Sequence, residues 1–131
     1  MKAIYVVTGS RQWEGDVGIV KNTMVGFYPE HERILYHGDC PDRGTGRSID
    51  WLARDIALEL GWEIKSFPAN WKEFGRSAGP IRNREMVKAA REEKDNGAIV
   101  EVYAWPTKSS IGTWDCVKKA KMLGLKVFVN D

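Results

Sequence analysis

Four glycine-containing loops carry the residues of this sequence that are best suited to bind an anion. The first is Thr8-Gly9-Ser10-Arg11, which follows an apolar, β-branched run. Its glycine allows a tight turn, and its hydroxyls, backbone amides and guanidinium group can donate hydrogen bonds to phosphate oxygens. The segment matches neither the G-x-G-x-x-G nor the Walker pattern. Two interpretations stay open: a phosphate-binding loop, and an ordinary turn between a strand and a helix.

The second loop, residues 37–48, contains three glycines and two arginines ahead of a predicted helix, an arrangement that can hold an anion. His37 is either a ligand contact or proton carrier or, more commonly for a lone histidine, a hydrogen-bonded structural residue. Asp39, Asp42 and Asp50 are candidates for binding ribose hydroxyls or a metal, but their spacing fits no calcium loop. Asp50 falls inside the predicted helix, where a solvated charge is the simpler interpretation. We predict no metal site and no cofactor.

The third loop, residues 67–79, is long for a compact domain, which favours a functional role. A helix is predicted over residues 80–94, with Arg82 and Arg84 near its start, where the helix dipole disfavours each cation by about 0.5 kcal/mol. We favour a bound anion that compensates these arginines. The alternative is a surface ion pair between Arg84 and a neighbouring glutamate.

The fourth loop, residues 104–115, connects a predicted strand to the last predicted helix. Gly112 and Thr113 would present backbone amides and a hydroxyl at the start of that helix, which is a further anion site. Trp105 is a candidate to stack on a base. For any single tryptophan near these loops, core packing or a dimer interface is the better account. These tryptophans are Trp13, Trp71, Trp105 and Trp114.

Strand-like and helix-like segments alternate along the chain and determine where these loops lie. The predicted strands are residues 3–7, 34–37, 63–67, 98–104 and 126–129, and the predicted helices are residues 16–27, 48–60, 80–94 and 113–123. Such alternation predicts a small Rossmann-like, doubly wound α/β fold with a parallel sheet of about five strands and helices on both faces. Ligands of such folds bind at the carboxyl ends of the strands, where strand order reverses.

Composition limits the function classes. A chain of 131 residues, 43% hydrophobic, predicts one domain spanning residues 1–131. The formal charge is only +2, from 20 basic and 18 acidic residues, so we expect no extended nucleic-acid track. We find neither a signal-peptide pattern nor an apolar run long enough to span a bilayer, so no membrane partner is expected. Cys40 and Cys116 fit no zinc or disulfide spacing, which predicts reduced thiols and a cytoplasmic location.

Taken in order, the motif residues resemble the YspA-like branch of the SLOG superfamily, which also contains cytokinin-activating phosphoribohydrolases and the DprA family of DNA-processing proteins. The resemblance spans nearly the whole chain, and the block from Gly75 to Met86 is its most specific part. It rests on Val6-Val7-Thr8-Gly9-Ser10-Arg11-x-Trp13, His37-Gly38, Phe67-Pro68-Ala69-x-Trp71, Gly75-Arg76-x-Ala78-Gly79-Pro80-x-Arg82-Asn83-x-x-Met86 and Gly112-Thr113-x-Asp115.

The resemblance implies a nucleotide-like ligand across these loops and a homodimer. We therefore expect a binding protein for a phosphate-bearing nucleotide or nucleotide-derived signal, acting as a sensor, carrier or sequestering protein. The predicted ligand-binding residues are Thr8, Gly9, Ser10, Arg11, Trp13, His37, Gly38, Asp39, Gly44, Gly46, Trp71, Arg76, Gly79, Arg82, Asn83, Trp105, Gly112 and Thr113.

An enzyme is the alternative. Phosphoribohydrolases of the superfamily use a Pro-Gly-Gly-x-Gly-Thr-x-x-Glu motif with an arginine on the preceding helix. Here Arg82 matches the arginine, but the glutamate position is Cys116, and a thiol cannot replace a carboxylate in glycosidic hydrolysis. Arg82 and Asp115 are the candidate catalytic residues, with Asp39 or Glu85 as other carboxylates. Binding of single-stranded DNA is a further alternative, which the near-neutral charge disfavours.

Overall fold

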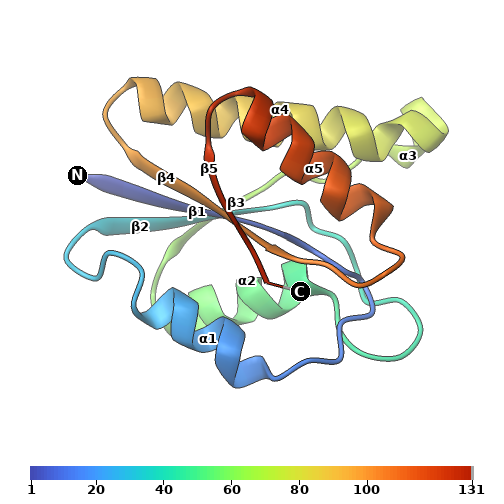
Figure 1. Ribbon diagram of the computed structural model, residues 1–131, viewed down its shortest axis with the longest axis horizontal. Helices are drawn as coiled ribbons and strands as arrows, with labels where there is room; N and C mark the ends of the chain where they lie inside the picture. The colour runs from blue at the N-terminus through green and yellow to red at the C-terminus, as the bar shows by residue number, and fades with distance from the viewer. Residues whose placement is uncertain (131) are drawn as a thin grey trace.

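A five-stranded parallel sheet forms the centre of the computed structural model, which describes residues 1–130. The strand order is β3-β2-β1-β4-β5, and every neighbouring pair is parallel. This confirms the predicted small Rossmann-like α/β fold (Figure 1). The strands are β1 (Lys2–Gly9), β2 (Glu32–His37), β3 (Glu63–Ser66), β4 (Ile99–Trp105) and β5 (Lys126–Val129).

Helices cover both faces of the sheet (Figure 1). α1 (Val17–Val25) and α2 (Ile49–Glu59) lie on one face, and α4 (Ala78–Asp95) and α5 (Ile111–Met122) lie on the other. A short helix α3 (Trp71–Phe74) and the 3₁₀ turn η1 (Gly75–Ser77) precede α4. No helix within residues 1–130 combines the length and apolar character needed to cross a membrane.

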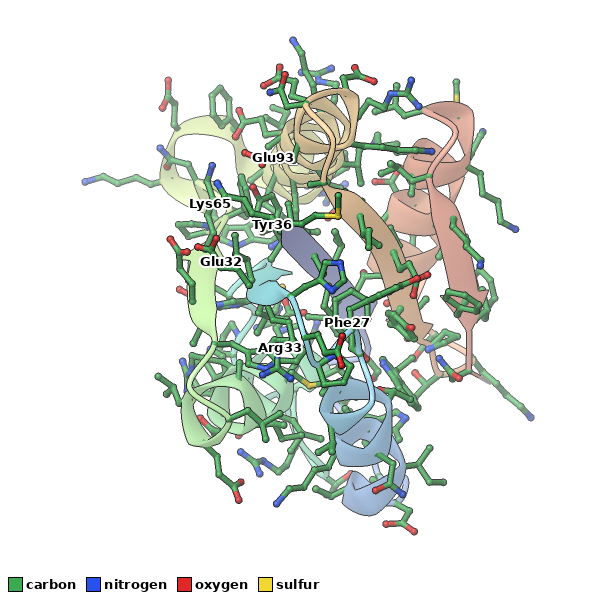
Figure 2. All side chains as sticks on the ribbon, turned by 90° about the vertical axis from the view of Figure 1, so that its left-hand side faces the viewer. Phe27, Glu32, Arg33, Tyr36, Lys65 and Glu93 are labelled. Carbon is green, nitrogen blue, oxygen red and sulfur yellow. The ribbon has the colours of Figure 1, made fainter. Side chains whose placement is uncertain are left out.

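The central strand explains why the core has two halves. Residues 3–7 of β1 are fully buried and alternate between the faces. Tyr5 packs with the α1 and α2 side, whereas Ile4 and Val6 pack with the α4 and α5 side. Figure 2, seen from the amino ends of the strands, shows Phe27 on the α1 side and Tyr36 toward α4. A strand covered on both faces reads as a continuous apolar run in the sequence.

The structure differs from the expectation in the connection after β3. The sequence predicts an irregular loop over residues 67–79, but α3 and η1 occupy much of it, and α4 begins at Ala78, before the predicted start. Asn70 caps α3, because its side-chain oxygen accepts the Glu73 backbone N–H at 3.0 Å. A four-residue helix is too short to show a 3.6-residue period, so hydrophobic patterning does not reveal it.

Candidate functional site

A cavity of about 630 Å³ opens at the carboxyl end of the sheet. Strand order reverses at the junction of β1 with β4, and the loops after both strands border the cavity. The starts of α2, α4 and α5, together with α3 and η1, supply the remaining walls. The position agrees with the general rule for ligand sites in doubly wound sheets.

Many of the predicted ligand-binding residues line this cavity, although they come from all four loops. The tip of the β1 loop also adds Gln12, which was not predicted. The predicted residues that line the cavity are Thr8, Gly9, Ser10, Arg11, Gly38, Trp71, Arg76, Gly79, Arg82, Asn83, Gly112 and Thr113, and Asp115 lines it as well.

His37 does not line the cavity and is fully buried. Its Nδ1 accepts the backbone N–H of Asp39 at 3.0 Å, and its Nε2 lies 2.8 Å from the Ser66 hydroxyl. Because Nδ1 is an acceptor, the hydrogen-bond network assigns the proton of the neutral ring to Nε2. Burial lowers the pKa of His37. The structural interpretation of this histidine is therefore the one that the geometry favours.

The other predicted residues outside the cavity also have packing roles. Asp39 accepts a hydrogen bond from the indole N–H of Trp51 at 3.0 Å. Gly44 and Gly46 lie in an exposed part of the β2 loop with positive φ angles. Trp13 and Trp105 pack edge to face, with ring centroids 5.8 Å apart. Trp105 is only 2% exposed, so neither face of its ring is free to stack on a base. Those outside are Trp13, His37, Asp39, Gly44, Gly46 and Trp105.

Arg82 is held at the back of the cavity by neutral groups. Only 8% of the residue is exposed. Its Nε donates to the side-chain oxygen of Asn83 at 2.8 Å, and its Nη1 donates to the carbonyl oxygen of Gly38. No carboxylate oxygen of residues 1–130 lies within 4.0 Å of this guanidinium group. Asp50, beside Gly38, is a nearby carboxyl group whose charge interacts with Arg82 without a direct ion pair, and a buried cation is unfavourable unless such groups or a ligand compensate it.

Arg82 lies in the second turn of α4, and not in the first as the sequence predicted, because α4 begins at Ala78. Arg84 is exposed and does not line the cavity. Burial beside Gly38, and not the helix dipole, is what distinguishes Arg82.

Three more arginines reach the cavity from its rim: Arg11, Arg43 and Arg76. Within the described chain, none of them has a carboxylate oxygen within 4.0 Å. The cavity therefore contains four guanidinium groups and the carboxyl groups of Asp50 and Asp115. Its net charge is positive, although the whole chain is close to neutral.

Asp115 is already paired. Lys119 Nζ lies 2.8 and 2.7 Å from its two oxygens, and the Asn83 amide donates to it at 3.0 Å. Asn83 also donates to the carbonyl oxygen of Gly112 at 3.1 Å, and so ties α4 to the start of α5. Cys116, at the position of the phosphoribohydrolase glutamate, is fully buried beneath the site, and burial raises the pKa of its thiol to about 12.

The start of α5 presents free donors to the cavity. Ser110 does not cap the helix; its hydroxyl instead accepts the Thr107 backbone N–H at 2.8 Å. The backbone N–H groups of Gly112 and Thr113 have no acceptor among the described residues. The Thr107 hydroxyl donates to Ser10 at 3.3 Å, which joins this loop to the β1 loop. Helix N-termini with free amides attract anions.

Asp50 is one of the three aspartates that the sequence suggests for ribose or metal binding, with a solvated helix charge as the simpler interpretation. Asp50 is only 5% exposed and lines the cavity, so the simpler interpretation is wrong. Its Oδ2 accepts the Cys40 backbone N–H at 3.2 Å. Burial raises the pKa of this carboxyl group, and the charge of Arg82 opposes the rise. The helical spacing of the sequence indicates this burial. Ala53 and Ala57 follow Asp50 at i+3 and i+7 and are buried, so all three residues lie on the inward face of α2.

Comparison with known proteins adds one relative. The chain is similar to the Gene 61 protein of Mycobacterium phage D29. The two are 28% identical over an alignment 131 residues long, which covers 93% of this chain and 91% of the phage protein. No protein-family model and no solved structure matches the chain.

Proposed function

We propose that this protein binds a phosphate-bearing, nucleotide-like small molecule in the cavity between β1 and β4, as a sensor, carrier or sequestering protein. The observation that carries the proposal is the set of four arginines without a carboxylate within 4.0 Å in residues 1–130. Arginine donates in a planar fork that matches phosphate oxygens. A phosphate dianion would compensate the buried charge of Arg82 and the exposed charges around it.

Two further features support the same ligand class. The free amides of Gly112 and Thr113 add uncharged donors at a helix N-terminus, next to the Ser10 hydroxyl. Trp71 and Ile111 line the outer part of the cavity and are 54% and 84% exposed. They offer an apolar surface to a planar base.

We also propose membership of the YspA-like branch of the SLOG superfamily. In support, most residues of its most specific block line one cavity: Arg76, Gly79, Pro80, Arg82, Asn83 and Met86. The phosphoribohydrolase alternative has weaker support, because Asp115 is paired with Lys119 and Cys116 is inaccessible. Single-stranded DNA binding has no support beyond the resemblance.

A ligand screen tests the proposal. We expect at least one of the nucleoside mono- and diphosphates, NAD, ADP-ribose and cyclic dinucleotides to raise the melting temperature. A ligand at 100 times its dissociation constant adds roughly 2.7 kcal/mol, or about 10 °C for a chain of this size. Arg76→Gln should weaken binding roughly tenfold, since a charge-assisted hydrogen bond is lost.

Arg84→Gln is the matched control, because Arg84 is exposed on α4 and lies outside the cavity. A melting temperature that no compound in the panel raises would contradict the proposal. Equal weakening by the two variants would show that general charge, and not the cavity, attracts the ligand.

The same nucleotides test the enzyme alternative. With Asp115 engaged by Lys119, we expect no free base when nucleoside monophosphates are incubated with the protein and the mixture is separated by liquid chromatography. Base release that disappears in Asp115→Asn would establish hydrolysis instead.

A further inference from the structure

Asp50 is a carboxyl group in a cavity otherwise suited to anions. Its only hydrogen bond of ordinary geometry within residues 1–130 is the one that Oδ2 accepts from the Cys40 backbone N–H at 3.2 Å. Burial raises its pKa, whereas the Gly38 backbone and the Cys40 thiol also act to lower it. No lysine or arginine nitrogen of the described chain lies within 4.0 Å of it. A cavity that binds only an anion does not need this carboxyl group. Its presence indicates that the ligand also carries a hydrogen-bond donor.

The chemistry of a buried carboxylate requires that donor. An ionised carboxylate only accepts hydrogen bonds, and it repels a phosphate oxygen placed against it. A ligand satisfies both Arg82 and Asp50 only if a hydrogen-bond donor lies next to its anionic group. Sugar hydroxyls and base amino groups are the two sources of such donors in a nucleotide.

Depth in the cavity favours the sugar. Asp50 lies against Gly38 and Arg82 at the inner wall: a Cβ added to Gly38 would be 2.4 Å from Arg82 Nη1 and 3.1 Å from Asp50 Oδ2. The apolar residues suited to a base, Trp71 and Ile111, lie at the exposed rim. A ligand whose phosphate contacts Arg82 and whose base lies at the rim has its sugar, which joins the two, within reach of Asp50.

We propose that Asp50 accepts hydrogen bonds from sugar hydroxyls of the ligand, and so makes the site specific for a phosphorylated ribose. This inference rests on the proposed function and deepens it. Asp50 thereby selects against free phosphate, which has no hydroxyl-bearing carbon skeleton, and against 2-deoxy sugars. The Gly38 position keeps Arg82 and Asp50 close enough for one ligand to contact both.

Isothermal titration calorimetry with three small probes tests this without knowledge of the base. The probes are ribose 5-phosphate, 2-deoxyribose 5-phosphate and inorganic phosphate. We expect the full-length protein to bind ribose 5-phosphate roughly tenfold more tightly than its 2-deoxy analogue, as expected for one hydrogen bond to a charged acceptor. Asp50→Asn should reduce this ratio to within about twofold, because the amide is a poorer acceptor. Asp55→Asn, on an exposed site of the same helix, should leave the ratio unchanged.

The outcomes separate the two claims. Equal binding of both sugar phosphates, or a preference that persists in Asp50→Asn, overturns the role of Asp50 but leaves phosphate binding intact. Tighter binding of inorganic phosphate than of ribose 5-phosphate also overturns it, since a protonated Asp50 would then donate to phosphate. Failure of all probes and of the nucleotide panel overturns the proposed function as well. If the asparagine variant does not fold, Asp50→Ser takes its place, and equal binding of the two sugar phosphates by the wild-type protein still overturns the role of Asp50.

Discussion

Arg82→Met should lower the affinity for the phosphate-bearing ligand by roughly 100-fold or more, while leaving the fold intact. Arg82 is only 8% exposed, and it lines the cavity. Loss of charge-assisted hydrogen bonds to a bound anion costs roughly 3 kcal/mol or more, which corresponds to about two orders of magnitude.

The expected effect of Arg82→Met on stability is much smaller. Methionine removes the hydrogen bonds to Gly38 and Asn83 but also removes a buried cation that has no carboxylate oxygen of residues 1–130 within 4.0 Å. We therefore expect the free energy of unfolding in urea to change by less than about 2 kcal/mol. Arg84→Met is the control on the exposed face of the same helix and should change neither quantity. Binding that stays within threefold of wild type would contradict the assignment of Arg82.

Gly9→Ala should destabilise the protein by about 1–3 kcal/mol, because the site has no room for a methyl group. An added Cβ would lie 2.6 Å from Cβ of Ile49, which is fully buried at the start of α2. The end of β1 and α2 would have to separate, and the cavity wall would move with them. Urea unfolding measures the effect.

Two controls define the cause. In Gly9→Ala with Ile49→Ala, the cost of the Gly9 substitution should shrink, which a double-mutant cycle reports as coupling. Gly112→Ala introduces a methyl group that meets nothing within 4 Å, so it should be neutral or stabilising through helix propensity. A Gly9→Ala variant as stable as wild type would contradict the close approach.

The fold was predictable because its signals are local. The buried run of residues 3–7 and the alternation of strands with helices define a parallel sheet, and its carboxyl edge then follows from topology. Much of the cavity lining was also predictable, because its glycines and arginines stand in loops that directly follow predicted strands.

The errors concern partners that are distant in sequence. Nothing near His37 reveals that Ser66 lies beside its ring, and nothing near Trp105 reveals Trp13. A solvated charge was the simpler interpretation of Asp50, because a charged residue in an amphipathic helix is usually exposed. Its burial depends on a neighbour without a side chain, Gly38, and on a positive charge from α4.

The position of the cavity between β1 and β4 has a consequence for cohesion. Residues 1–66 form β1, β2 and β3 with α1 and α2, and residues 67–130 supply α4, α5, β4 and β5. A ligand that contacts Arg11 and Asp50 from the first half and Arg82 and Gly112 from the second spans the junction. Its binding free energy then opposes separation of the two halves, so the bound protein should resist local unfolding between β1 and β4 more than the free protein does.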